Sequence, residues 1–300
     1  MSRKRKIVIT IIAGVVVTIG GLAIAFVLSS PPAPELSIDV ETKEIPLSWV
    51  EPEPPADTAV PDTETPAGPF VFTGRLAMIG DGKPFGEEAY ELTIAEDQVT
   101  LHSTGRFWFK VVIATVNVTF EQTLTAEADL RPVLYAAEFH APLGFDRSVR
   151  ATVENDRVIV EDSDDTEQIV IEPERTFALG TFSTYVLLPR LFALRHEDGS
   201  ASFEVLVFGG PPNQGSDDSA EDGLPVMTVE RAGTASLRAG DVLLDAECYV
   251  VSSDLGESEL FARGNEFLAF RAGGEDESLL VYRSDFFPDG VEIVNVTSSR

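Results

Sequence analysis

Apolar and polar positions alternate along most of the chain after residue 69. The alternating runs are separated by short turn sequences such as "GDGKPFG" and "PDG". Successive side chains of a strand point to opposite faces, so this period of two predicts strands with one buried face. Short connections favour antiparallel neighbours, and we therefore predict a mostly antiparallel sheet. The predicted strands cover 70–79, 87–94, 97–103, 107–124, 132–140, 147–154, 157–161, 167–172, 202–208, 226–232, 241–251, 257–263, 266–271, 279–283 and 291–296.

The run 107–124 is predicted to form an unusually long strand. Its even-numbered face stays apolar almost throughout, whereas its odd-numbered face changes from apolar to polar near Ala114–Thr115. A straight strand of this length would measure about 60 Å, so we expect it to coil or bend at that point. A hairpin is the alternative, but no turn residue occurs there before Asn117. The apolar face would line the concave side of a strongly curved half-barrel through these side chains: Trp108, Val112, Val116 and Phe120.

The segment 183–194 has no strict alternation and predicts one short buried helix, or two turns. Ser183 is a plausible N-cap, Leu187, Leu191 and Leu194 fall on one helical face, and Pro189 should kink or split the helix. Such a helix could fill the concave face, and so could a lipid-like ligand. A plain packed core is the alternative.

The N-terminus predicts a membrane anchor. Residues 7–28 are uncharged and mostly apolar, long enough as a helix of about 33 Å to cross a bilayer core of about 30 Å. The basic flank 1–6 places the N-terminus in the cytoplasm and the domain 69–300 outside it, under the positive-inside rule. A cleaved signal peptide is the alternative, because Ala23-Ile24-Ala25 resembles a cleavage site.

The stretch 29–68 is predicted to be a linker. Residues 31–68 contain nine prolines, nine acids and one lysine, too polar a composition to fold alone. An extended proline-rich chain of this length reaches about 120 Å. One part, "LSIDVETKEIPLSWV", alternates at Leu36, Ile38 and Val40 and ends in Leu47 and Trp49, and we expect that it can dock as an edge strand.

Composition and charge narrow the function classes. The net charge is −28, and no basic stripe offers a surface for nucleic acid. The one cysteine, Cys248, alternates with Ala246 and Val250 and is expected to be a small buried hydrophobe. With one cysteine no intramolecular disulfide can form, so cysteine usage does not indicate whether the protein lies in an oxidising or a reducing compartment.

The sequence contains no constellation typical of catalysis. His102, His140 and His196 lack metal-ligand spacing, and no phosphate loop or nucleophile elbow occurs. The acidic run 161–168 lacks the glycine and glutamate of a calcium loop. We therefore predict that the protein is not an enzyme and needs no metal or cofactor. Arg283 and Asp285 share one face of a strand end and are expected to pair.

Three segments resemble a family of uncharacterised exported bacterial proteins. They are "GEEAYELTIAEDQVTLHSTGRF" (86–107), "QTLTAEADLRPVLYAAEF" (122–139) and "LLVYRSDFFPDGVEIV" (279–294). The family consists of β half-barrels similar in shape to periplasmic lipoprotein carriers of the Lol type. The resemblance implies a half-barrel that can hold acyl chains, and it carries over no catalytic residue. A membrane anchor would prevent shuttling between two membranes.

These observations predict a single-pass, membrane-anchored envelope protein with an extracytoplasmic β domain that binds a lipid-like or other apolar ligand. The alternative is a non-catalytic scaffold that binds an envelope protein partner through a domain with a fully packed core. Oligomeric state, ligand and partner stay open.

Overall fold

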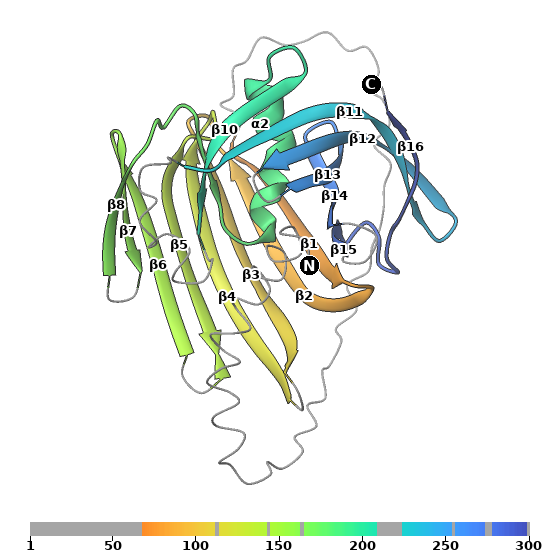
Figure 1. Cartoon of the computed structure of the whole chain (residues 1–300), viewed down its shortest axis with the longest axis horizontal. Coiled ribbons are helices and arrows are strands. Elements are labelled where there is room, and N and C mark those ends of the chain that lie inside the picture. The colour runs from red at the N-terminus through yellow and green to blue at the C-terminus, as the bar shows by residue number, and fades with distance from the viewer. Residues whose placement is uncertain are drawn as a thin grey trace, which may run out of the picture.

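The computed structural model describes residues 68–111, 114–142, 145–162, 165–208, 224–253, 256–273 and 278–298. The predicted basic flank, membrane helix and nearly all of the linker lie outside these residues. No helix within the described part of the chain is both long and apolar enough to cross a membrane. The elements in chain order (Figure 1) are β1 (Phe70–Gly80), β2 (Lys83–Ile94), β3 (Gln98–Val111), β4 (Ala114–Glu127), β5 (Pro132–Ala141), β6 (Phe145–Glu154), β7 (Arg157–Asp162), β8 (Asp165–Val170), β9 (Thr176–Leu179), the 3₁₀ helix η2 (Phe182–Leu187), α2 (Leu188–Arg195), β10 (Ser200–Val207), β11 (Val226–Ala239), β12 (Val242–Ser253), β13 (Gly256–Arg263), β14 (Glu266–Gly273), β15 (Ser278–Arg283) and β16 (Glu292–Ser298).

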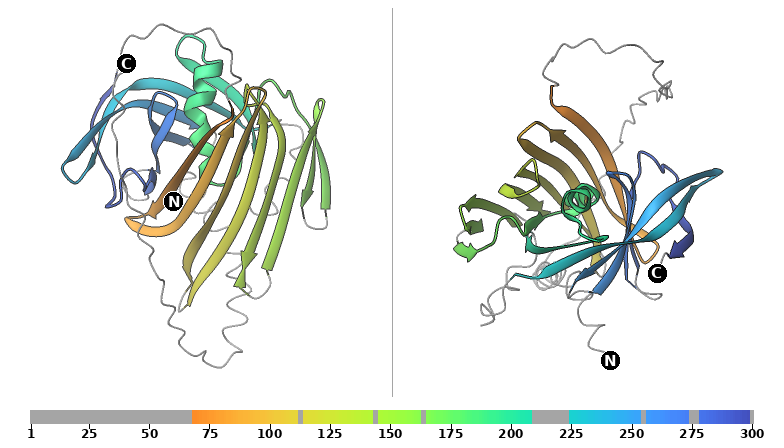
Figure 2. Two further views of the ribbon diagram at one scale, coloured as in Figure 1. Left: turned by 180° about the vertical axis from the view of Figure 1, so that it is seen from behind. Right: turned by 90° about the horizontal axis from the view of Figure 1, so that it is seen from above.

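All the strands belong to one curved sheet, in the order β8-β7-β6-β5-β4-β3-β2-β1-β15-β14-β13-β12-β11-β10-β9, with β16 beside β11. Every pairing is antiparallel except that of β9 with β10. Over the described residues the fold is therefore mostly β with one short helical segment, as the alternation predicted. Figure 2 shows two curved halves, β2–β8 and β10–β16, with the helical segment between them.

The predicted long strand 107–124 is a hairpin instead. β3 and β4 pair in register from Gln98↔Glu127 to Val111↔Ala114, so the chain reverses between Val111 and Ala114. The apolar side of a hairpin lies on odd positions in one arm and even positions in the other, because paired residues share a face. The change of polarity near Ala114–Thr115 thus marks a turn rather than a bend. The sequence prediction also missed β9, which is only four residues long.

The helical segment has two parts that meet near Pro189. Residues 182–187 form η2, and α2 begins at Leu188, so the proline occupies the first turn of α2, where its missing N–H costs little. The predicted split of the helix is thus confirmed. The predicted N-cap role of Ser183 is wrong, because Ser183 lies inside η2. Leu187 and Leu191 are buried, whereas Leu194 is 48% exposed.

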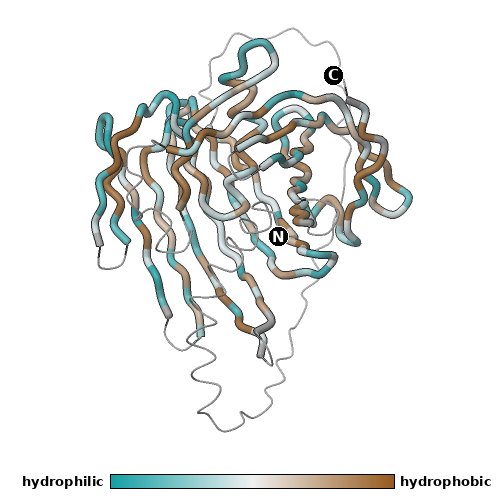
Figure 3. Tube along the Cα trace, in the orientation of Figure 1, coloured by the Kyte–Doolittle hydropathy of each residue, from teal (hydrophilic) through white to brown (hydrophobic). Residues whose placement is uncertain are grey.

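Two apolar cores lie on opposite faces of the β10–β16 half. The larger core packs the helical segment and β9–β10 between the two halves of the sheet. The smaller core lies under the C-terminal segment 284–298, where β16 folds back onto β11, and contains Cys248 at 1% exposure. The buried position of Cys248 is confirmed. Brown and teal alternate along the strands of the β2–β8 half in Figure 3, as expected of a sheet with one apolar face.

Candidate functional site on the concave face of the sheet

The concave face of the β2–β7 half carries Phe107 and Phe109 from β3 and Val116 and Phe120 from β4. The register pairs Phe107 with Val118 and Phe109 with Val116, so these side chains share one face. Val116 and Phe120 therefore lie on the concave face. Val112, which was also predicted to line the concave face, lies outside the described residues.

Trp108 lies on the opposite, convex face, which corrects the prediction that it shares a face with Val116 and Phe120. It pairs with Asn117 across the hairpin. Its indole Nε1 donates to the carbonyl oxygen of Pro84 at 2.8 Å, and the guanidinium of Arg106 lies 5.6 Å from the ring centre. The error follows from the missed hairpin, because the reversal moves the concave face from odd to even positions.

Phe120 is part of a packed aromatic row and is only 3% exposed. Its ring is stacked with Phe107 at 4.8 Å between ring centres and lies 6.1 Å from Phe139. The ring lies over Gly105, where an added Cβ would be 2.5 Å from the Phe120 Cζ atom. Position 105 therefore has no room for a side chain, and Phe120 belongs to the core rather than to an open wall.

The helical segment and β10 fill most of the concave face. Tyr135 of β5 stacks on Phe208, which follows β10, at 4.4 Å between ring centres. On the other side, Tyr185 of η2 lies 4.8 Å from Phe270, and Phe192 of α2 lies 4.9 Å from Tyr249. Phe182 of η2 also lies 6.4 Å from Phe107 of β3 between ring centres, so the segment packs against both halves of the sheet. Of the fillers that the sequence left open, the segment 183–194 is the one that the structure places on the concave face.

A buried polar network fixes the start of this segment to the sheet. The Glu88 carboxylate accepts hydrogen bonds on Oε1 from the hydroxyls of Ser103 (2.6 Å) and Thr181 (2.5 Å). Its Oε2 accepts from the backbone N–H of Ser183 (3.0 Å). Glu88, Ser103 and Ser183 are each at most 2% exposed. The network joins strands β2 and β3 to η2 without contact with solvent.

Gln122 sets the direction of these hydrogen bonds. Its Oε1 accepts from the Tyr135 hydroxyl (3.1 Å) and the Thr181 N–H (3.0 Å), so its amide nitrogen must donate to Ser183 Oγ, at 2.8 Å. Ser183 then donates to Ser103 Oγ at 3.0 Å, and Ser103 donates to Glu88. Every donor therefore points toward the carboxylate, and polar groups in such a chain strengthen one another.

Burial changes the acid–base behaviour of this network. Loss of solvation raises the pKa of Glu88 above its ordinary value, and the hydrogen bonds from Ser103, Ser183 and Thr181 oppose the rise without cancelling it. Burial also raises the pKa of Tyr135, with a further contribution from the Glu88 charge, and raises that of Tyr185 to about 12. The carboxylate is enclosed by its donors, so the network acts as a structural clamp.

The concave face is more open toward the tip of the β3–β4 hairpin. Phe107, Phe109 and Val116 are only partly buried there, in contrast to Phe120. Arg147 and Asp162 form an ion pair on the same face, with Nε 2.9 Å from Oδ1 and the two side chains 27% and 29% exposed. This end of the face therefore combines apolar side chains with a half-buried ion pair.

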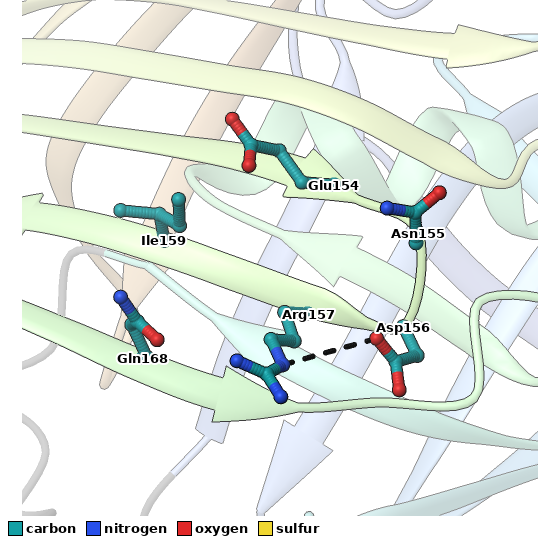
Figure 4. Close-up of a pocket in the computed structure, with 6 residues that line it drawn as sticks. All are labelled: Glu154, Asn155, Asp156, Arg157, Ile159 and Gln168. Carbon is teal, nitrogen blue, oxygen red and sulfur yellow. Dashed lines mark ion pairs between the residues drawn. The ribbon is translucent and has the colours of Figure 1, made fainter.

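Two surface depressions lie elsewhere. One, of about 320 Å³, is lined at the β6–β7 turn by Glu154, Arg157 and neighbouring residues, with Arg157 Nε 3.9 Å from Asp156 Oδ1 (Figure 4). The other, of about 420 Å³, lies beside the start of β1 and is lined by Thr73, His102 and Asp285 among others. Beside the second depression, His102 Nδ1 lies 3.2 Å from Thr123 Oγ1.

The predicted Arg283–Asp285 pair is confirmed. Arg283 Nε and Nη2 donate to the two Asp285 oxygens at 2.8 and 2.6 Å, while the guanidinium lies 4.5 Å from the Phe286 ring centre. Arg283 is 6% exposed. Among the described residues, no group of three histidine, cysteine, aspartate or glutamate side chains is placed to hold a metal ion.

Glu88, Ser103 and Gln122 were not singled out from the sequence, and Ser183 was predicted only as an N-cap. The first three do carry a signal, because each is a polar residue at an inward position of an alternating strand, as Glu88 is between Gly86 and Tyr90. A polar residue at a core position predicts a buried partner. The partner cannot be read from the sequence, because Ser183 lies 95 positions after Glu88.

No protein-family model matches the sequence, and no curated protein matches it. Among solved structures, the chain is similar to a β-barrel-like protein of the domain of unknown function DUF1849 from Brucella abortus, with a TM-score of 0.45, 10% identity and coverage of 76% of this chain and 98% of that chain. It is also similar to a DUF1089 family protein from Pseudomonas aeruginosa, with a TM-score of 0.37, 12% identity and coverage of 74% and 97%. These likenesses are too distant to carry an argument about function, and the similarity to Lol-type carriers stays a prediction.

Proposed function

We propose that this chain is a membrane-anchored envelope protein whose β domain binds an apolar chain, such as a lipid acyl chain, at the open end of its concave face. The observation that carries the proposal is the partly exposed apolar strip formed by Phe107, Phe109 and Val116 at the hairpin end. Most of the concave face is filled by the helical segment, so the ligand would contact only this end. The membrane placement rests on the apolar run 7–28 and its basic flank.

The geometry suits a chain-like ligand better than a compact one. Strands rise about 3.3 Å per residue, so the strip from Phe107 to Phe109 and across to Val116 is a short, narrow track rather than a deep cavity. The Arg147–Asp162 pair lies on the same face and offers polar groups that could orient a headgroup. Binding would be non-catalytic, because the polar groups of the filled part form a closed network.

A scaffold with a fully packed core is the second candidate. The observation that favours it is the burial of Phe120 at 3% and Val118 at 6%, both on the same strand as Val116. If packing continues to the hairpin tip, the strip is simply the edge of the core. The envelope partner would then bind another surface of the domain.

Photo-crosslinking in the full chain separates the two candidates. A benzophenone amino acid at position 116 faces the concave side, and the same residue at position 117 faces the convex side next to it. In cells fed an alkyne-labelled fatty acid, the proposal expects labelled lipid on the protein with the probe at 116 and none with the probe at 117. Equal labelling at both positions would reflect membrane proximity, and no labelling at 116 would favour the scaffold.

The Val116→Trp variant gives an independent check. In an open or ligand-filled track, the larger ring should leave the unfolding midpoint nearly unchanged and abolish lipid labelling by a probe at position 109. In a packed core, it should destabilise the domain by about 1–3 kcal/mol through overpacking. A destabilised Val116→Trp variant, together with no lipid labelling by the position-109 probe when Val116 is unchanged, would refute lipid binding.

A further inference from the structure

The first half of β1 has an open edge. β15 pairs with β1 only from Leu76↔Arg283 to Gly80↔Leu279, and no described strand pairs with Phe70–Gly74 on the side away from β2. Such an edge presents backbone N–H and C=O groups that can accept another strand. The three side chains at the start of this edge are exposed although they are large and apolar: Phe70 (62%), Val71 (55%) and Phe72 (52%).

The backbone groups that face this edge can be identified. The Arg75 N–H donates to Asp285 Oδ1 at 3.2 Å, and the Arg75 carbonyl accepts from the Ser284 N–H at 2.9 Å, so both groups of Arg75 point away from β2. Backbone groups alternate sides along a strand, and the N–H and C=O of Thr73 and Val71 therefore point to the open edge as well. The Asp285 carboxylate accepts the hydrogen bond from the Arg75 N–H that a backbone carbonyl of a paired strand would otherwise accept, and the ladder with β15 ends there.

We propose that residues 36–49 of the same chain dock on this edge and extend the sheet beside Phe70–Thr73. This segment alternates at Leu36, Ile38 and Val40 and ends in Leu47 and Trp49, a pattern that suits a half-buried edge strand. The intervening residues up to 69 are numerous enough to form the connecting loop. The apolar side chains of the segment would cover the exposed rings of β1.

The length and charge of the chain favour this occupant over a second copy. The segment is tethered directly to β1, which gives it an effective concentration on the order of millimolar. Two copies of a chain with a net charge of −28 repel each other, and this repulsion opposes pairing between their edges. Pairing through main-chain hydrogen bonds with alternate side chains in contact is also a common way in which sheets bind peptides.

The chain contains a built-in reporter for this contact. It has two tryptophans, Trp49 and Trp108, so Trp108→Phe leaves Trp49 as the single fluorophore. In the full chain purified in detergent, docking should shift Trp49 emission to shorter wavelength and protect it from acrylamide. In Thr73→Pro, the proline removes one edge-facing N–H and leaves the ladder with β2 intact, so both effects should be lost.

Thr73→Ala is the matched control, because it keeps the N–H and should behave like the parent. Ile38→Asp tests the same contact from the segment side without changing any described residue, and it should also expose Trp49. This second variant keeps the proposal testable if Thr73→Pro does not fold. Protection of Cys248 from thiol reagents reports that each variant is folded, because that side chain is buried.

Three results would overturn the proposal. Equal accessibility of Trp49 in the parent, Thr73→Pro and Ile38→Asp proteins would show that the segment does not dock. Trp49 shielded in all three would place the segment elsewhere, for example in the detergent micelle. A dimer in sedimentation experiments that Thr73→Pro dissociates, without a change at Trp49, would assign the edge to a second copy.

Discussion

Replacing Ser183 by alanine tests whether the buried network clamps the helical segment to the sheet. The Ser183 hydroxyl accepts from Gln122 Nε2 and donates to Ser103 Oγ, and the side chain is fully buried. The substitution removes both hydrogen bonds, each with a net value of about 1 kcal/mol, and leaves a Gln122 N–H without a partner. We expect a loss of about 2–3 kcal/mol in the free energy of unfolding, because no water can reach the vacated site.

Urea denaturation followed by circular dichroism measures this loss, and thermal unfolding should show a decrease of roughly 4–12 °C for a domain of this size. Ser202→Ala is the matched control. The Ser202 hydroxyl also forms a hydrogen bond, at 2.9 Å to Thr228 Oγ1, but on an exposed part of β10, so its removal should change stability by at most about 0.5 kcal/mol. Equal midpoints for Ser183→Ala and Ser202→Ala would refute the clamp.

A double-mutant cycle with Ser103→Ala sharpens the test. Ser103 and Ser183 touch and belong to one chain of donors that ends at Glu88. Groups in one network are coupled, so the double variant should differ from the sum of the single variants by about 0.5–3 kcal/mol. Additive effects would mean that the two hydroxyls act independently.

Three further predictions concern Gly105, Cys248 and Glu88. Gly105→Ala should destabilise by about 1–3 kcal/mol, since its Cβ would collide with the Phe120 ring, whereas Gly68→Ala, with no atom nearby, should be neutral in the same urea titration. Burial raises the pKa of Cys248 to about 11, so a thiol reagent at mildly alkaline pH should modify it only after unfolding; rapid modification of the folded protein would contradict its position. Because the pKa of Glu88 is raised, the folded state binds the proton of this carboxyl group more tightly than the unfolded chain does. The stability that the protonated group contributes is therefore lost as the pH rises through the folded pKa. The stability of Glu88→Gln minus that of the parent should therefore increase from acidic to neutral pH, and a flat or falling difference would show that the carboxylate is stabilised by its donors.

The alternation of apolar and polar residues predicted most strands because each has one buried face, and only local pattern is needed for that inference. The β3–β4 hairpin was missed because "FWFKVVIATVNV" contains no glycine, proline or aspartate where the chain reverses. The change of apolar parity around Ala114–Thr115 was visible and fits a hairpin better than a bend. Trp108 was consequently assigned to the wrong face.

The buried clamp could not be predicted from the sequence for a different reason. Glu88 and Gln122 are recognisable as polar residues at inward positions, but 50 acidic residues make any single glutamate inconspicuous. Their common partner, Ser183, lies in a segment whose 3₁₀ conformation depends on packing between the two halves of the sheet. Contacts over such sequence distances follow from topology, which local periodicity does not contain.

The position of β1 in the sheet has a consequence for how the chain folds as it is synthesised. β1 joins the two halves of the sheet, and its contact with the segment after β15 bridges 210 positions, from Arg75 to Asp285. The meander β1–β8 contains only neighbouring hairpins and can form early, whereas the join at β1 must wait until β15 has left the ribosome. Closing so long a loop is slow. A chain that ends before residue 278 would therefore keep the first meander and expose the outer edge of β1 along its whole length, a form prone to aggregation.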